Sequence, residues 1–258
     1  MNQALLSKFP EWYKDISADK YYMVLSNDFD SYYSCKLLKK LYGLTIGGFY
    51  SLNSGLYLNP KRVEGKEPIF MDLSVTRGKT FDNHFTFIKN PESINPNVIT
   101  DIYYKKYNGS TLALLCSLFK RDLSQYNEES LTALLCIDGW YIGYYNKGGK
   151  YKDINIYWYE MLEMDKYLLP ILQAHDSQYF IDFTNEYRLN EPITINDNYL
   201  HCNLDIGLPT YEFELVQPVT RENMYSSELR MLHNKNPNSI ITAAECYKDR
   251  YSICRKAE

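Results

Sequence analysis

Three apolar runs in the first half of the chain predict buried β-strands. They cover residues 21–25, 44–50 and 68–73, and polar residues do not alternate regularly with the apolar ones within them. A continuous apolar run of this length is typical of a strand that is covered on both faces, as in a parallel sheet. The first half therefore contains at least three candidate core strands.

Helical periodicity follows these strands. From Ser31 onward, Leu37, Leu38 and Leu41 share one side, and Gly43 provides a stop signal. A second helix is predicted after Ser110, which can cap it, and a third near Glu128. Strands that alternate with helices in this way predict an α/β domain with a mostly parallel sheet flanked by helices.

The pattern changes at the turn-rich segment 146–150, after which a helix is expected around residues 157–173. Short alternating runs follow, which we interpret as strands, with Lys248-Asp249 as a hairpin turn; the runs are residues 191–195, 211–216, 239–243 and 251–254. We therefore divide the chain into an α/β domain (1–147), a helical linker (148–175) and a smaller, mixed, β-rich domain (176–258).

Composition narrows the class of protein. The chain has 258 residues and a net charge of −4, which argues against a broad, non-specific surface for duplex DNA. No run of 18 apolar residues and no signal-peptide pattern is present, so we expect a cytoplasmic protein that does not span a membrane. The six cysteines show no CxxC spacing, which favours free thiols over zinc ligands.

Tyrosine is unusually frequent, with 26 residues. One interpretation is that tyrosine fills core positions where phenylalanine would also serve. The other is that some rings stack on nucleobases, since any aromatic face can do so. The sequence does not assign particular rings to either role.

Four carboxylates carry the main chemical signal. Asp28 and Asp30 follow the first predicted strand, Asp72 ends the third, and Asp138 closes an apolar helical stretch. Carboxylates gathered at one sheet edge repel each other unless a cation lies between them. The pattern predicts a divalent-metal site and a phosphoester substrate.

In their order along the chain, these segments and Phe81-Asp-Asn-His-Phe85 resemble the motifs of the DHH phosphoesterase superfamily over about residues 20 to 145. That superfamily includes RecJ-type exonucleases, oligoribonucleases and cyclic-dinucleotide phosphodiesterases. The resemblance implies a DHH-type domain in which Asp28, Asp30, Asp72 and Asp138 bind one or two ions, with Asp72 as the bridge. It also implies that His84 contacts the substrate phosphate, so the expected catalytic residues are Asp72 and His84.

The chain departs from the family pattern at two histidine positions, which are Ser26 and Asn83 here. The Asn83 amide oxygen is a substitute ligand. An oxygen-rich set makes magnesium more plausible relative to manganese and weakens binding. An alternative register, which places Asp28 at the first motif position, puts Tyr32 at the third acidic one and also loses a ligand.

In the second half, Ser252-Ile-Cys-Arg255 loosely matches a family substrate-binding segment. The resemblance makes Ser252 and Arg255 candidate phosphate contacts, although a solvated Arg255 is the simpler interpretation. The family's glycine-rich loop has no counterpart in this sequence.

Two functions follow as hypotheses. The first is a manganese- or magnesium-dependent phosphodiesterase that hydrolyses single-stranded or short oligonucleotides or a cyclic dinucleotide. The second is a catalytically degenerate DHH-fold protein that binds a nucleotide, a nucleic acid or a protein partner. A homodimer is a further hypothesis about its partners.

Overall fold

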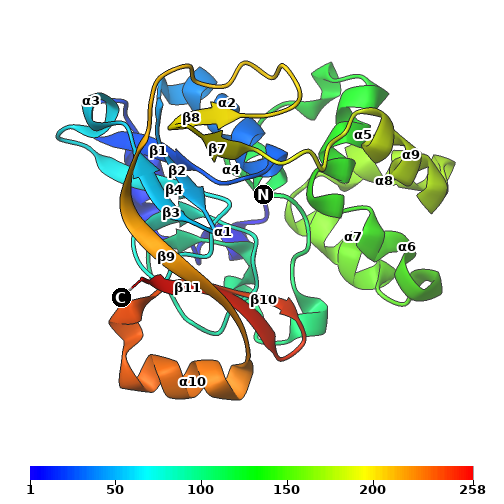
Figure 1. Ribbon diagram of the computed structural model, residues 1–258. Coiled ribbons are helices and arrows are strands. Elements are labelled where there is room, and N and C mark those ends of the chain that lie inside the picture. Colours follow the sequence, from blue (N-terminus) through cyan, green and yellow to red (C-terminus); the bar gives the residue numbers. More distant parts are fainter. Residues whose placement is uncertain (258) are drawn as a thin grey trace.

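Strand β1 (Tyr21–Leu25) lies inside a nine-stranded sheet (Figure 1). The structure is a computed structural model. It describes residues 1–257, apart from the side chain of Lys147. The strand order is β10-β11-β9-β3-β2-β1-β4-β5-β6. The other eight strands of this sheet are β2 (Ile46–Ser51), β3 (Gly55–Leu58), β4 (Glu67–Met71), β5 (Lys79–Phe81), β6 (Ser93–Ile94), β9 (Glu214–Tyr225), β10 (Ile240–Tyr247) and β11 (Arg250–Lys256). A second, two-stranded sheet pairs β7 (Thr194–Asn196) with β8 (Tyr199–His201).

The large sheet is mixed. Strands β2, β1, β4, β5 and β6 pair in parallel, whereas β3, β9, β11 and β10 continue the sheet from β2 through antiparallel pairs. The predicted α/β class is confirmed, and the parallel arrangement holds for the half of the sheet that contains the carboxylates. Figure 1 shows β9 curving from the parallel half down to the C-terminal hairpin.

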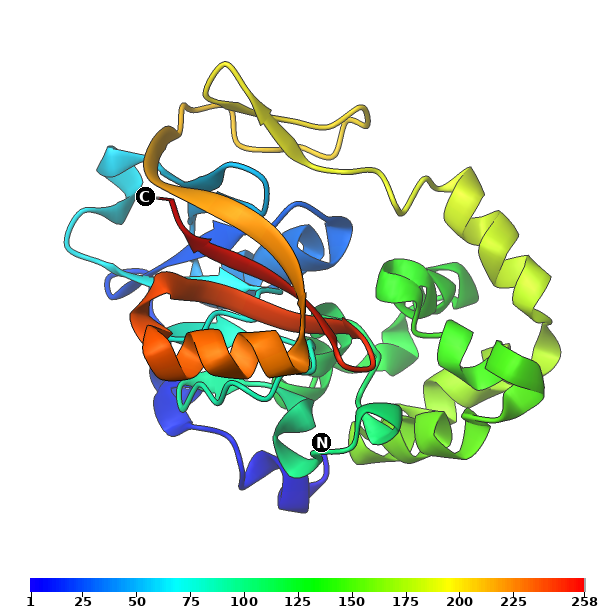
Figure 2. The same ribbon diagram turned by 60° about the horizontal axis from the view of Figure 1, so that its bottom comes forward.

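Eight of the ten α-helices in the described part of the chain lie in three groups. The α-helices are α1 (Gln3–Leu6), α2 (Phe29–Tyr42), α3 (Pro60–Val63), α4 (Thr111–Leu118), α5 (Glu128–Cys136), α6 (Ile142–Gly149), α7 (Lys152–Met161), α8 (Asp165–Ala174), α9 (Ser177–Glu186) and α10 (Ser226–Lys235). Helices α2 and α4 pack near the sheet, α5 to α9 gather at one side of it, and α10 lies beside β9 to β11 (Figure 2). The α5–α9 group runs through positions 147 and 176, where we placed domain boundaries from the sequence.

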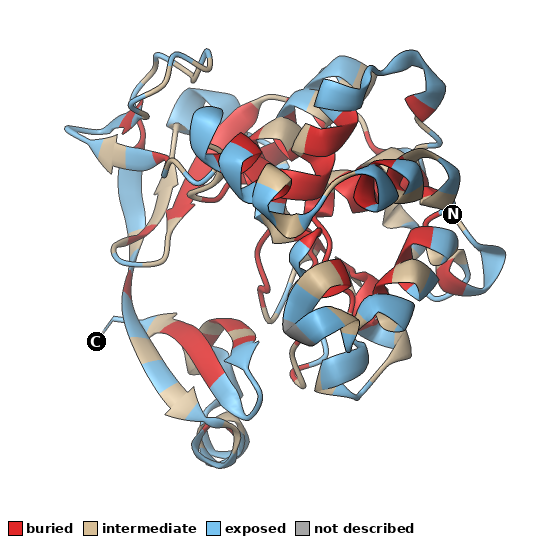
Figure 3. Cartoon of the chain, turned by 90° about the vertical axis from the view of Figure 1, so that its right-hand side faces the viewer, coloured by how far each residue is buried: buried red, intermediate tan, exposed pale blue. Residues whose placement is uncertain are grey.

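Both faces of the parallel strands are covered. In β1, Met23 and Leu25 belong to the main core with α2 and α4, whereas Tyr22 and Val24 belong to a second core with Val219 and Cys254 of the C-terminal strands. The residues of β1 are all apolar because both faces of the strand are buried, as we inferred from the sequence. Figure 3 shows buried residues along the inner strands and the inward faces of the helices.

Helix ends are set by local chemistry. Asp28 caps α2, whose C-terminus is closed by Gly43 in the left-handed conformation (φ 70°). The side chain of Ser110 caps α4, as predicted. The single helix expected over residues 157–173 is wrong: the chain forms α7 and α8, and Glu163 between them has φ 55°, which interrupts helical hydrogen bonding.

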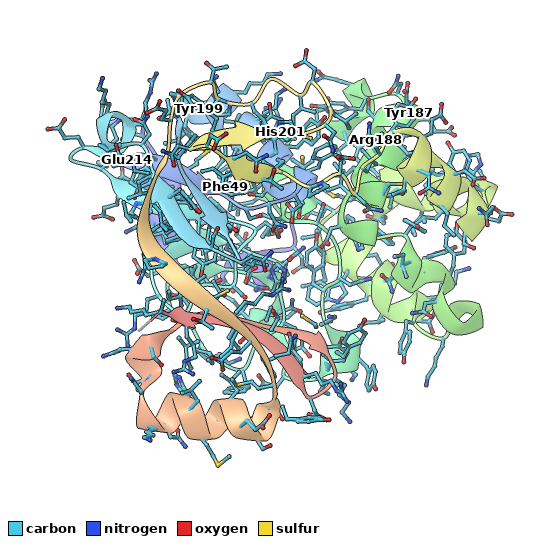
Figure 4. The ribbon with its side chains drawn as sticks, viewed as in Figure 1. Phe49, Tyr187, Arg188, Tyr199, His201 and Glu214 are labelled. Carbon is cyan, nitrogen blue, oxygen red and sulfur yellow. The ribbon has the colours of Figure 1, made fainter. Side chains whose placement is uncertain are left out.

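Strands β9, β10 and β11 are longer than the alternating runs from which we predicted them. Lys248 and Asp249 form the turn between β10 and β11, as expected. Figure 4 marks the start of β9 at Glu214 and the small hairpin at Tyr199 and His201, in the same upper part of the view. Of the helices described, none has the length and apolar character needed to cross a membrane.

Candidate functional site

Asp28 and Asp72 meet at the carboxyl ends of β1 and β4. Asp28 Oδ1 accepts a 2.9 Å hydrogen bond from the Ser31 backbone N–H, which fixes the carboxylate at the start of α2. The Ser31 hydroxyl donates to the Met71 carbonyl oxygen at 3.0 Å and accepts a 2.8 Å bond from the Ser26 N–H. Ser31 thus ties the ends of two neighbouring strands together, directly beside both carboxylates.

Asp72 is held in a less common backbone conformation. It has φ 56°, in the left-handed region, and its N–H donates to the Phe81 carbonyl at 2.9 Å. Aspartate tolerates this region better than most residues. Its Oδ1 accepts a 2.8 Å hydrogen bond from the Thr111 hydroxyl, which joins β4 to the beginning of α4. The buried Asp72 carboxylate is therefore oriented from two sides.

Asp82 and His84 follow β5, the next parallel strand. His84 Nδ1 donates to Asp82 Oδ1 at 2.7 Å, and the other Asp82 oxygen accepts a 2.9 Å bond from the Asn95 amide. Asp82 is buried, while 39% of the His84 side chain is exposed. Because Nδ1 is bonded to Asp82, the Nε2 atom of His84 is the ring nitrogen that can contact a ligand.

Asp138 joins the site from the short 3-10 turn Ile137–Gly139. It also has a left-handed backbone (φ 58°) and accepts a 2.6 Å hydrogen bond from the Asn83 amide nitrogen. The same nitrogen donates to the Gly109 carbonyl at 2.9 Å. Asn83, expected as a metal ligand, thus uses its nitrogen to position Asp138, which leaves the amide oxygen as its only potential ligand atom.

Asp30 has a different environment from the one the sequence suggested. It lies in the first turn of α2, and its two oxygens accept 2.6 and 2.7 Å hydrogen bonds from the N–H groups of Thr111 and Leu112. These donors are at the start of α4, where backbone N–H groups lack intrahelical partners. Asp30 therefore anchors α4 to α2 with both of its oxygens.

Carboxylate repulsion shapes the protonation of the site. Burial, with Asp72 as the nearest like charge, raises the pKa of both Asp28 and Asp30 well above the usual range. The pKa of Asp72 is also raised by burial, although the positive charge of His84 opposes the rise. Asp138 lies at the solvent-open edge, but the surrounding protein and Asp72 raise its pKa to about 7. The metal-free site thus holds more negative charge than its surroundings stabilise.

The pKa values of two nearby cationic side chains, His84 and Lys106, shift in opposite directions. Burial lowers the pKa of His84, but the charges of Asp82, Asp72 and Asp138 outweigh it and raise the pKa well above its ordinary value. Burial lowers the pKa of Lys106, although Asp138 draws it upward. His84 is therefore the cation most closely coupled to the carboxylates.

A divalent ion fits this donor set. Asp72, Asp82 and His84 each offer a ligand atom within 4.8 Å of the others. Asp28 and Asp138 add charge beside them. Carboxylate oxygens suit magnesium and manganese, and an imidazole suits manganese better. Asp82 was absent from the ligand set predicted from the sequence, yet it follows the apolar residue Phe81 at a strand end, as Asp72 does after Met71.

Two of the predicted substrate contacts have partners within the C-terminal strands. Ser252 Oγ accepts a 3.0 Å hydrogen bond from Arg221, and Arg255 forms a 3.1 Å ion pair with Glu222. Both residues lie on β11 and both of these partners on β9. Neither interaction links them to the aspartates.

One cavity borders the carboxylates, and two others lie around Tyr103 and Tyr104. A cavity of about 180 Å³ is lined by Asp28, Asp30 and Asp138 together with residues 189–192. Two further cavities, of about 240 and 480 Å³, share the rings of Tyr103 and Tyr104. Lys106, which interacts with Asp138, lines the smaller of these two.

Comparisons with known protein families, with curated proteins and with solved structures find no match to this chain. The function must therefore be inferred from the geometry and from the resemblance of the motifs.

Proposed function

We propose that the chain is a divalent-metal-dependent phosphodiesterase of DHH type that hydrolyses single-stranded or short oligonucleotides or a cyclic dinucleotide. One observation supports this most strongly: Asp28, Asp72, Asp82, His84 and Asp138 converge from four separate segments, with raised pKa values at Asp28, Asp72 and Asp138. Such a cluster is costly without a cation.

Asp72 and Asp82 would hold the ion, with Asp28 and Asp138 at its border. A bound magnesium or manganese ion would supply an activated water and neutralise charge on the phosphate. In the hydrolysis, the water oxygen bonds to phosphorus, the ester P–O bond breaks, and the proton released by the water ends on the leaving oxygen. His84 would face the phosphate as a cation kept protonated by Asp82.

Aromatic rings around Lys106, which interacts with Asp138, support a single-stranded substrate. Tyr104 and Tyr151 stack at 5.9 Å with an interplanar angle of 6°, and Tyr103 packs edge-on against Tyr104. Lys106 lies 4.3 Å from the Tyr103 ring centre, and Lys248 lies 5.8 Å from that of Tyr104. Rings with adjacent ammonium groups are the usual means of binding unpaired bases and their phosphates.

The test combines metal binding with turnover. Calorimetry with manganese and magnesium should show saturable binding, and the loaded protein should cleave short RNA, single-stranded DNA or a cyclic dinucleotide. Asp72→Asn should abolish both, whereas Asp182→Asn, at an exposed carboxylate of α9 that accepts a hydrogen bond from Gln178, should change neither. Absence of ion binding together with absence of cleavage would refute the enzymatic proposal.

A second candidate function is a degenerate domain that binds nucleotide, nucleic acid or protein without hydrolysis. It is favoured by two expected ligands that have internal roles, since Asp30 anchors α4 and the Asn83 nitrogen holds Asp138. Metal-independent oligonucleotide binding without turnover would support it. In either case we propose a cytoplasmic location, which the six free cysteines support.

A further inference from the structure

A further cavity is lined by none of the aspartates described above. Its volume is about 810 Å³, and it is bordered by α2, the start of β2, α3 and the segment 206–211. This segment, which we call the strap, has no regular secondary structure. The Tyr32 hydroxyl donates to the Gly207 carbonyl at 3.0 Å, and the Tyr211 hydroxyl donates to the Ile46 carbonyl, so the strap is tied down at both ends.

The cavity is lined by four cationic side chains and no carboxylate. Lys36, Lys39 and Lys40 come from α2 and Arg62 from α3, and within residues 1–257 none of them takes part in an ion pair. The chain as a whole is acidic, with a net charge of −4. Four uncompensated positive charges around one hollow are therefore a local concentration of charge against the overall balance.

Aromatic rings position two of these cations. Lys36 Nζ lies 5.5 Å from the ring centre of Tyr32, and the Arg62 guanidinium lies 4.9 Å from that of Tyr211. Tyr32 and Tyr211 are also the residues that tie down the strap. The rings that fix the strap thus hold cations beside the opening.

The inner wall of the cavity is apolar, and its side chains are buried. Met23 and Cys35 are almost fully buried and Ile46 is 9% exposed, and Leu208 and Pro209 of the strap form the wall opposite the sheet. A hollow of this size with an apolar wall and a few charged groups matches the usual form of a small-molecule site, about 300–1,000 Å³.

We propose that this cavity binds a small molecule that carries at least two phosphate groups, with the phosphates at the lysines and Arg62 and the body against the apolar wall. Ammonium groups bind phosphate as point charges, and a guanidinium group binds it as a fork. Because the anchored strap covers one side, a compact ligand fits better than a continuous nucleic-acid strand.

Calorimetry in EDTA with inorganic pyrophosphate and with ADP tests the proposal, because chelation removes metal from the aspartates. Both probes should bind saturably, ADP more tightly because its nucleoside reaches the apolar wall. Arg62→Glu and Lys39→Glu should each weaken binding at least tenfold. Lys61→Glu, at the exposed neighbour that does not line the cavity, should change Kd less than twofold.

The outcome separates this site from the proposed active site. Asp72→Asn should leave pyrophosphate binding in EDTA unchanged, even if it abolishes metal binding. The proposal is overturned if neither probe binds, or if Lys61→Glu weakens binding as much as Arg62→Glu does. It is also overturned if a short oligonucleotide binds more tightly than ADP and loses affinity in the Arg62 variant, because the cavity would then be part of a nucleic-acid path.

Discussion

His84 Nδ1 lies 2.7 Å from Asp82 Oδ1, and the second Asp82 oxygen is held by Asn95. The buried carboxylate therefore fixes the orientation of the imidazole and raises its pKa against the effect of burial. This relationship makes Asp82 a positioning residue for His84 whether or not an ion is bound.

The first prediction concerns this pair. Asp82→Asn should lower the pKa of His84, because burial then acts with less opposing negative charge. NMR titration of the His84 ring protons in EDTA measures the change directly. Asp101→Asn provides the control, since its exposed carboxylate pairs with Lys89 instead. An unchanged His84 titration in the Asp82 variant would contradict the assigned role.

The second prediction is a pH dependence of stability. Asp138 has its pKa raised from 3.8 to about 7, so between these values the folded protein binds more protons than the unfolded chain. Stability of the metal-free protein should therefore fall as pH rises through this window. The raised pKa of His84 acts in the same direction, since its stabilising charge is lost as pH rises through the folded value.

Thermal unfolding in EDTA over this pH range should show a melting temperature that decreases toward neutral pH. Saturating manganese should reduce or reverse the trend, because the ion replaces bound protons. Asp138→Asn should flatten the EDTA curve. A melting temperature that rises with pH in EDTA would mean that other carboxylates dominate.

The third prediction separates Asp30 from Asp28. Asp30→Ala leaves two N–H groups at the start of α4 without their acceptors, which should cost about 2 kcal/mol of unfolding free energy after relief of charge repulsion. Asp28→Ala removes one helix cap and should cost about 1 kcal/mol or less. Urea denaturation in EDTA measures both values.

Metal affinity should follow the reverse order, with the larger loss for Asp28→Ala, since Asp28 lies beside Asp72 and has only one backbone donor among its contacts. Equal stability losses would contradict the anchoring role of Asp30, and a greater loss of metal affinity in the Asp30 variant would place Asp30, and not Asp28, beside the ion.

The fourth prediction concerns Gly109, whose carbonyl accepts from Asn83. A Cβ at this position would lie 2.5 Å from the Trp140 ring and 2.6 Å from the Tyr107 hydroxyl. Gly109→Ala should destabilise the fold by about 1–3 kcal/mol and weaken metal binding through displacement of Asn83. Gly65→Ala, where a Cβ has open space, should cost only its backbone strain and leave metal binding intact.

Local chemistry made much of the parallel half predictable. The apolar run of β1, the glycine after α2 and the Ser110 cap of α4 each depend on residues close in sequence. The approach of the carboxylates followed from the rule that parallel strands end at the same edge. These features need no knowledge of distant contacts.

The remaining features depend on contacts between distant segments. Asp30 bonds to Thr111 and Leu112, and no local pattern distinguishes such a helix anchor from a metal ligand. Asp82 was noted within the Phe81–Phe85 motif but was not assigned as a ligand, because β5 has only three residues, too few to display a strand that ends at the site. The pairing of β9 with β3 was not predictable either, since the exposed pattern of β9 does not specify its partner.

That last pairing has a consequence for biosynthesis. Strand β3 ends at Leu58, but the strand that covers its open edge begins only at Glu214. While the chain emerges from the ribosome, the nascent N-terminal half presents a row of unsatisfied backbone groups at Gly55–Leu58 until β9 (Glu214–Tyr225) has been made. Premature termination before β9 would thus release a fragment whose parallel strands are complete but whose edge can recruit another chain.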